Sequence, residues 1–298
     1  MQQIFEAMEA RLGELLPGCY ADRIVYHYTG IDVLDVLMSD GADLYGTHSE
    51  ALNDDAEFWS GYNYVLRFLR EKKGWSEIMI SWATARFKER FEKGDIAAWV
   101  MSFSREEDSL YQWVAYTDRK VGGCAIGFDR QELDTAAKSS NANYPNVLLG
   151  LSPCLYLCQD EKVMDGILDL LYDEFLQGCY GAQGATMPQI QNKLELVMVL
   201  FSALVKHESF KCEREWRLLA LTNEQYDSSL VSIIGRKPRL PFQVFGQKRK
   251  VRDAVRKIVI SPQGLTKVNK TAVKLICRKY GLQEKIAIDR SNSPYNGL

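Results

Sequence analysis

The chain has 298 residues, 46% of them hydrophobic and 26% charged, and its formal net charge is −2 at pH 7. This composition is ordinary for a soluble globular protein with a substantial core, and no apolar run approaches the length of a membrane span. The seven cysteines are scattered, and no second Cys or His pair accompanies Cys154 and Cys158, so we expect no zinc site.

The first predicted element is an amphipathic helix in residues 1–16, where apolar residues recur at helical spacing with acidic residues between them. A signal peptide would instead begin with basic residues and continue as an unbroken apolar stretch. We therefore expect a cytoplasmic protein with no membrane partner.

Strand-like and helix-like segments then alternate along the chain. The predicted strands are 23–28, 97–103, 121–128, 146–158, 213–221, 255–261 and 285–289. The predicted helices are 31–38, a segment that follows Asp54, 75–92, 105–117, 160–179, 188–208 and 265–281. No Gly-rich phosphate loop follows a strand, and the helices cluster. We expect one α+β domain over residues 1–298, with a mainly antiparallel sheet and a helical insertion at about 159–209.

One of only three histidines, His27, stands at the end of the first predicted strand. On a strand, His27 and Thr29 point to one face and Tyr28 to the other. A lone histidine in such a place is usually a core residue. Whether His27 has a functional role therefore depends on which other polar residues share a cleft with it.

Two further segments place polar and aromatic residues together. Ser102 and Ser104 lie two apart at a strand end and so face the same side. Ser104 also has capping-box spacing to Glu107, which marks a helix start. Trp113 and Tyr116 follow at a spacing that lets them share a face of that helix, as core aromatics or as a platform for a flat ring.

The segment 213–221 carries the strongest signal from the residues alone. Strand alternation places Glu213, Glu215 and Arg217 on one face, at the start of a strand that continues into the core. Two carboxylates and a guanidinium there would perturb one another's pKa values, which is typical of a functional site. A structural Glu–Arg pair explains the pattern equally well.

The charge is unevenly distributed. Residues 1–60 hold twelve Asp or Glu, whereas residues 236–257 hold nine Lys or Arg and a single Asp. The basic stretch would attract phosphate backbones, and its Phe242 and Phe245 would stack on bases. The alternative is a solvated loop that balances an acidic face of the same fold.

Several motifs in this order resemble a large bacterial family of uncharacterised domains. They are H-Y-T around His27, L-N-D-x-x-E from Leu52, S-F-S with a later W-x-x-Y from Ser102, and E-x-E-W-R from Glu213. The resemblance covers most of residues 24–296 apart from the helical insertion. That family in turn resembles the ADP-ribosyltransferase superfamily, in the branch that includes nucleic-acid-modifying toxins. The implied fold is a split, mainly antiparallel sheet with flanking and inserted helices.

The resemblance implies an NAD site built from three strand segments. His27 would hydrogen-bond a ribose hydroxyl, Ser102 would brace the site, and Asn53 would lie on a loop that orders the nucleotide. Glu215 would be the catalytic carboxylate and Glu213 would contact the acceptor. One aromatic residue of W-x-x-Y would stack on nicotinamide. The implied cofactor-binding residues are His27, Tyr28, Thr29, Asn53, Ser102, Ser104, Trp113, Tyr116 and Arg217.

The leading hypothesis is a mono-ADP-ribosyltransferase that transfers ADP-ribose from NAD to a macromolecule and needs no metal. Cleavage of the nicotinamide–ribose bond builds positive charge on the sugar, which a fixed carboxylate stabilises. The basic stretch favours nucleic acid, such as RNA, slightly over protein as the acceptor. A toxin or anti-phage defence effector, with an antitoxin or regulatory partner, fits this chemistry.

Two alternatives remain open. One is a non-catalytic module that senses a nucleotide or binds a partner through the same cleft. The other is a metal-dependent nuclease or phosphoesterase, because carboxylates and one histidine suit hard divalent ions. Its ligands would come from His27, Asp54, Asp55, Glu57, Glu213 and Glu215.

Overall fold

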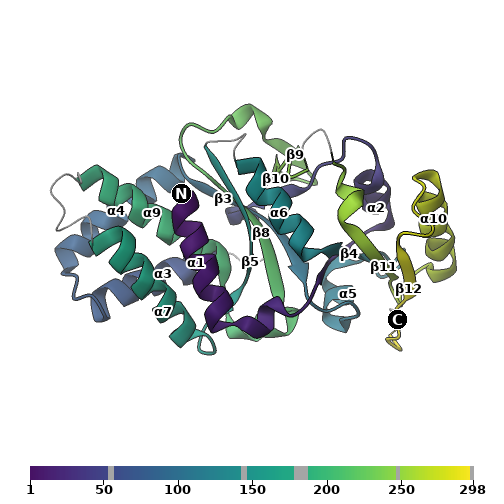
Figure 1. The fold of residues 1–298 in the computed structure, drawn as a ribbon, viewed down its shortest axis with the longest axis horizontal. Coiled ribbons are helices and arrows are strands. Elements are labelled where there is room, and N and C mark those ends of the chain that lie inside the picture. Colours follow the sequence, from purple (N-terminus) through teal and green to yellow (C-terminus); the bar gives the residue numbers. More distant parts are fainter. Residues whose placement is uncertain (53–56, 142–145, 178–186, 246–248, 296–298) are drawn as a thin grey trace.

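A computed structural model describes residues 1–52, 57–141, 146–177, 187–245 and 249–295. It is an α+β structure with a mainly antiparallel sheet, as predicted. Figure 1 shows helices gathered beside one end of the sheet, with α2 and α10 at the opposite end.

The strands within the described residues form one large sheet and one small parallel pair, β6–β7. They are β1 (Ile24–Thr29), β2 (Tyr45–His48), β3 (Ala97–Ser104), β4 (Cys124–Asp129), β5 (Val147–Pro153), β6 (Leu155–Tyr156), β7 (Val205–Lys206), β8 (Glu215–Thr222), β9 (Ser232–Ile234), β10 (Lys237–Pro241), β11 (Val255–Ile260) and β12 (Ala287–Arg290). In the large sheet only the β11–β12 pair is parallel.

The large sheet forks at β3. One edge of β3 pairs with β8 along all eight residues. Two strands share the other edge: β1 pairs at Ser104, whereas β2 pairs at Val100 and Trp99. One arm then continues from β1 through β4 and β11 to β12, and the other from β2 through β10 to β9. Between the arms, Met101, Ser102 and Phe103 have no strand partner on that edge.

Helices cover both faces of the sheet. They are α1 (Gln2–Leu15), α2 (Ile31–Met38), α3 (Glu57–Glu71), α4 (Glu77–Glu92), α5 (Leu110–Tyr116), α6 (Arg130–Ser140), α7 (Glu161–Leu171), α9 (Met187–Leu204) and α10 (Thr266–Lys279). Helices α1, α3, α4, α7 and α9 share one core with sheet residues such as Val100. Helices α2, α6 and α10 share the other with residues such as Trp99. Alternate side chains of β3 thus enter opposite cores.

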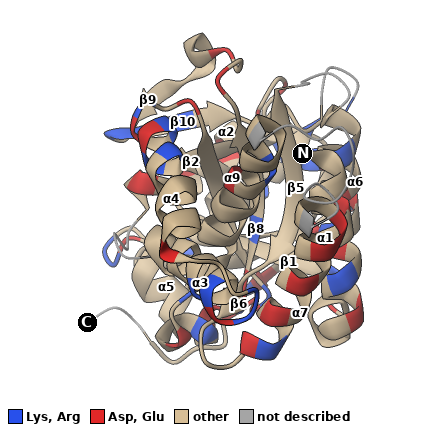
Figure 2. Ribbon diagram, turned by 90° about the vertical axis from the view of Figure 1, so that its left-hand side faces the viewer, with Lys and Arg blue, Asp and Glu red and all other residues tan. Residues whose placement is uncertain are grey.

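The segment 159–209, predicted as a helical insertion, does not have a core of its own. Helix α7 packs on α1, and α9 packs on α3 and α4. All of these helices belong to the core that contains Val100, called the first core below; the core that contains Trp99 is the second. Acidic and basic residues both occur along α1, α3 and α7 (Figure 2).

Some predicted boundaries are wrong. The helix expected at 105–117 begins only at Leu110: the Ser104 hydroxyl donates to the Glu213 carbonyl oxygen (2.7 Å) and accepts from the Glu106 backbone N–H (3.1 Å) in a turn that precedes α5. The strand expected from Glu213 begins at Glu215, because Arg214 has a left-handed backbone (φ 44°). Helix α6 and strands β2, β9 and β10 were not predicted.

The contact between α3 and α9 requires a glycine. A Cβ atom added to Gly61 would lie 2.2 Å from the backbone oxygen of Phe201, whereas one added to Gly13 of α1 would meet nothing within 4 Å. We expect Gly61→Ala to destabilise the fold by about 1–3 kcal/mol through overpacking. Gly13→Ala should stabilise it by about 0.5–1 kcal/mol through lower chain entropy. Denaturant unfolding measures both, and equal effects would contradict this packing.

Candidate functional site

A cavity of about 610 Å³ opens in the fork between the two arms of the sheet. Its volume lies in the range of small-molecule sites. Both β1 and β2 contribute to its wall, and so does the unpaired part of β3, including Met101 from one sheet face and Ser102 from the other. The predicted site residues that line it are His27, Tyr28, Thr29, Ser102, Tyr116, Glu215 and Arg217.

His27 bridges the fork. Its Nδ1 lies 3.0 Å from the carbonyl oxygen of Ser102. A carbonyl oxygen can only accept, so Nδ1 carries the proton of this bond. Burial lowers the pKa of His27; the bond to Ser102 opposes that shift and the charge of Arg239 adds to it. The ring is therefore neutral near pH 7, and its Nε2 atom is left as a hydrogen-bond acceptor, which suits a ligand hydroxyl.

A buried charge cluster forms another part of the wall. The Lys206 ammonium donates to Glu213 Oε2 at 2.7 Å and to Glu215 Oε2 at 2.5 Å. The Arg217 Nε atom donates to Glu215 Oε1 at 2.8 Å, and Nη1 donates to the Ala203 carbonyl oxygen at 2.5 Å. Two cations and two carboxylates thus balance within the interior, which is the condition for burying charge at a tolerable cost.

The same cluster drives the two carboxyl pKa values apart. Burial alone would raise the pKa of Glu215, but Arg217 and Lys206 outweigh it and hold that pKa well below its usual range. Burial raises the pKa of Glu213; Lys206 opposes that shift and the charge of Glu215 adds to it. Glu215 therefore ionises at a lower pH than Glu213.

Three predicted site residues lie outside the cavity wall. Glu213 reaches it only through Lys206, and Ser104 is buried behind it, where it holds the Glu213 carbonyl. Trp113 is completely buried against Tyr28, with ring centroids 4.6 Å apart, so it does not share the exposure of Tyr116 and offers no surface to a ring. Tyr116 does line the cavity.

The remaining predicted residue, Asn53, lies outside the described residues, as do Asp54 and Asp55. Glu57 begins α3, and its side chain is not described. Within the described ranges, no group of three or more His, Cys, Asp and Glu side chains is arranged to hold a metal ion.

The sequence interpretation missed most of the second arm of the fork. Tyr45 and Thr47 of β2 line the cavity, as do Lys237 and Arg239 of β10. Each pair is two residues apart and so faces one side, which is the signal that reveals them. Lys206 was missed as well. It lies in β7, directly after the apolar C-terminal part of α9, and a lysine next to such an apolar segment indicates a buried ion pair.

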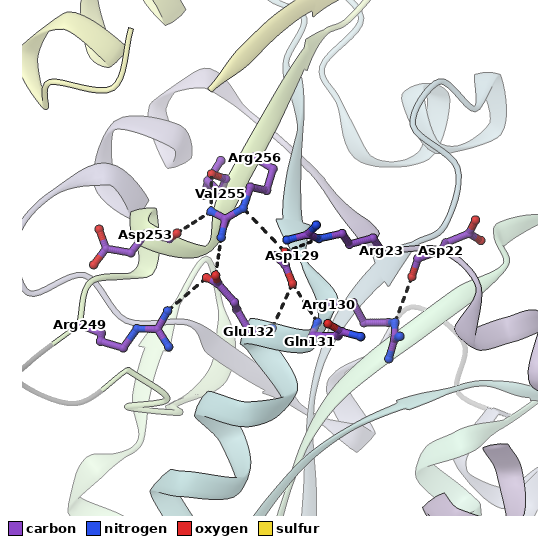
Figure 3. A network of polar contacts seen from close by, with 10 residues as sticks. All are labelled: Asp22, Arg23, Asp129, Arg130, Gln131, Glu132, Arg249, Asp253, Val255 and Arg256. Atoms are coloured by element: carbon purple, nitrogen blue, oxygen red, sulfur yellow. Dashed lines mark hydrogen bonds and ion pairs between the residues drawn. The ribbon is translucent and has the colours of Figure 1, made fainter. Parts of the chain in front are cut away.

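Part of the basic stretch 236–257 is paired inside the fold. Glu132 at the start of α6 accepts from Arg256 (2.5 Å) and Arg249 (3.2 Å), and Arg256 also approaches Asp129 (Figure 3). These contacts match the alternative in which the basic stretch balances acidic residues of the same fold.

The neighbouring basic residues are paired in the same way. Lys250 and Arg252 both lie 2.6 Å from Asp40, one of the acidic residues near the N-terminus. The expectation for the two phenylalanines is wrong: Phe242 and Phe245 are buried in the second core and cannot stack on bases. Binding of nucleic acid by this stretch stays a prediction, and it would require the paired side chains to exchange partners.

Comparison with known proteins gives one similarity, to a family whose function is unknown. A family model described as "Protein of unknown function (DUF2971)" matches residues 112–218, a segment that includes Tyr116, Lys206, Glu215 and Arg217. This part of the chain is similar to that family, in agreement with the predicted resemblance to uncharacterised domains. Neither the curated proteins nor the solved structures gave a match. Every helix in the described ranges is too short or too polar to cross a membrane.

The lowered pKa of His27 predicts a pH dependence of stability. The unfolded chain, with a histidine pKa near 6.5, binds protons that the folded chain excludes, so His27 contributes stability above about pH 6.5 and loses it as the pH falls. Replacement by Asn, whose amide can still donate to Ser102, should reduce the slope of unfolding free energy between pH 5.5 and 7 by up to about 1.4 kcal/mol per pH unit. Equal slopes in wild type and His27→Asn would contradict a neutral buried ring.

The charge balance around Lys206 predicts a mutational rescue. Lys206→Met leaves two buried carboxylates without their shared cation and should cost about 3–5 kcal/mol of unfolding free energy. Adding Glu213→Gln removes one of those carboxylates and should recover part of the loss. Denaturant unfolding of the single and double variants checks this, and a double variant no more stable than Lys206→Met would show that the three charges are not coupled.

Proposed function

We propose that this protein is a mono-ADP-ribosyltransferase that uses NAD as the donor and a macromolecule as the acceptor. The observation that carries the proposal is the convergence of His27, Ser102 and Glu215, from three separate strands, on one cavity. The fork in the sheet supports a split-sheet fold like that of ADP-ribosyltransferases. Nucleic acid is the favoured acceptor, and a toxin or anti-phage effector controlled by a partner is the favoured setting.

The geometry provides groups for each end of the donor ribose. The Nε2 atom of neutral His27 would accept a hydrogen bond from a ribose hydroxyl. The bond between the nicotinamide nitrogen and ribose C1′ breaks with its electrons leaving on nicotinamide. Ionised Glu215 would stabilise the positive charge that develops on the sugar, until the acceptor forms a bond to C1′ and loses its proton.

The walls of the cavity suit the rest of the donor. Tyr116 lines it and is 38% exposed, so it can pack against the nicotinamide ring in the role that Trp113 cannot take. Glu213 acts as a positioning residue, because it holds Lys206 without touching the cavity. This differs from the acceptor contact that the family resemblance implies for it.

A specific observation favours a second candidate, a nucleotide-binding module without turnover. Both Glu215 oxygens are already engaged, by Arg217 and Lys206, which leaves the carboxylate few free lone pairs. Calorimetry distinguishes the two functions: binding of NAD without loss of NAD would support the module.

The test of the proposed function is NAD consumption with a matched control. Wild type, incubated with labelled NAD and total RNA, DNA or cell lysate, should release nicotinamide and label one class of acceptor. Glu215→Gln should reduce labelling by about 10²–10³-fold, as loss of a transition-state charge contact does.

Glu195→Gln is the control because Glu195 is equally buried and paired with Arg86 and Arg90, but lies on α9 outside the cavity wall. It should label like wild type. Circular dichroism establishes that both variants are folded. Full labelling by folded Glu215→Gln, or no loss of NAD with any acceptor, would refute the proposed function.

A further inference from the structure

One cation of the fork cavity has no partner. Arg239 lines the cavity, its Nε atom is buried without a hydrogen bond, and its guanidinium makes no ion pair within the described part of the chain. The other guanidinium of the cavity, that of Arg217, contacts both Glu215 and the Ala203 carbonyl. Buried polar groups in folded proteins nearly always have partners, so an unpaired Nε atom in a cavity wall is available to a ligand group.

The backbone holds Arg239 firmly in this position. Strand β10 lies between β2 and β9, where Arg239 pairs with Thr47 on one side and Ser232 on the other. Lys237 lies two residues earlier on β10, faces the same side and also lines the cavity. The second arm of the fork therefore brings two positive side chains to one wall.

Within the described residues, Arg239 forms no ion pair with a carboxylate that lines the cavity. Glu215 is engaged by Lys206 and Arg217, in a cluster whose charges already balance. Asp32 and Asp43 also line the cavity, and burial raises the pKa of Asp43. The cavity thus has Arg239 and Lys237 on one wall and two further carboxylates, Asp32 and Asp43, in its lining.

The chemistry of these groups selects the ligand. A guanidinium with its parallel N–H donors is well matched to phosphate oxygens. A carboxylate such as Asp43 accepts hydrogen bonds from hydroxyl or amino groups. Apolar side chains, among them Val100 and Ile234, also line the cavity and suit an aromatic base. A nucleotide combines all three kinds of group.

We infer that Arg239 binds a phosphate group of a nucleotide in the fork cavity. This deepens the proposed function and rests on it for the identity of the nucleotide, because NAD would place its diphosphate against β10. The recognition of phosphate itself does not require that any transfer takes place.

Calorimetry with ADP and adenosine tests the inference. Wild type should bind ADP more tightly than adenosine. Arg239→Met keeps an unbranched side chain but removes the charge, and it should weaken ADP binding by about 10- to 100-fold, the usual range for hydrogen bonds to charged groups, without changing adenosine binding. Arg236→Met is the matched control, since Arg236 is exposed on the same hairpin and does not line the cavity.

Thermal unfolding without ligand is the second measurement. An unpaired, partly buried guanidinium destabilises the folded state, so Arg239→Met should melt at or above the wild-type temperature. An arginine with a purely structural role would behave in the opposite way, and its loss would lower the melting temperature.

Three outcomes would overturn the inference: no ADP binding by wild type, equal loss of ADP and adenosine affinity in Arg239→Met, or ADP binding that Arg239→Met leaves unchanged. The result is separable from that of the proposed function. A protein that binds ADP through Arg239 but never consumes NAD would retain this site and lose only the transferase activity.

Discussion

The structure depends on a competition for one edge of β3. Strands β1 and β2 both pair with this edge, but at different residues, and β8 occupies the other edge completely. The two arms therefore diverge and leave backbone groups near Ser102 without a strand partner. Backbone carbonyls in a protein interior need a donor, and His27 supplies one. The histidine thus completes the sheet and, by the same bond, leaves its Nε2 atom as the acceptor that a ligand can use.

Charge is distributed around this opening in two different ways. Lys206, Arg217, Glu213 and Glu215 form a balanced cluster, and such a cluster can be buried because each charge has an opposite partner at hydrogen-bond distance. Arg239, on the arm that starts at β2, makes no ion pair with the part of the chain that the structure describes. The balanced cluster fixes the geometry of Glu215, whereas the Nε atom of Arg239 is buried in the cavity wall without a hydrogen bond. The two regions therefore contribute differently, one to rigidity and the other to affinity.

The sequence allowed the α+β class and most of the first arm of the fork to be predicted, because β1, β4 and β11 have six residues each and are rich in apolar side chains. His27, Ser102 and Glu215 were found for a related reason: each is a polar residue at or near the end of a clear strand. Strands β2, β9 and β10 were not predicted because they are short and partly polar. Strand β10 also contains two prolines, which are rare in central strands.

The errors inside the site have specific physical causes. Trp113 and Tyr116 have a spacing that allows a shared helix face, but α5 is only seven residues long, and Trp113 is drawn into a small aromatic core with Tyr26 and Tyr28. Their different exposure depends on that core, which no local pattern reveals. Lys206 follows a helix and precedes a turn. Its carboxylate partners Glu213 and Glu215 come close to it only because the chain folds back through residues 208–213.

The arrangement of Lys206 bears on how Glu215 can act. A carboxylate held by two cations is well placed and fully ionised, but part of its charge is already neutralised. Because Lys206 also contacts Glu213, it has a second carboxylate to hold if Glu215 turns toward a ligand. The raised pKa of Glu213 fits this role, since a carboxyl that is costly to ionise alone gains most from keeping the ammonium. In the proposed reaction the paired glutamates would then not be two equivalent acids: Glu213 would retain the cation, and Glu215 would become available to the sugar.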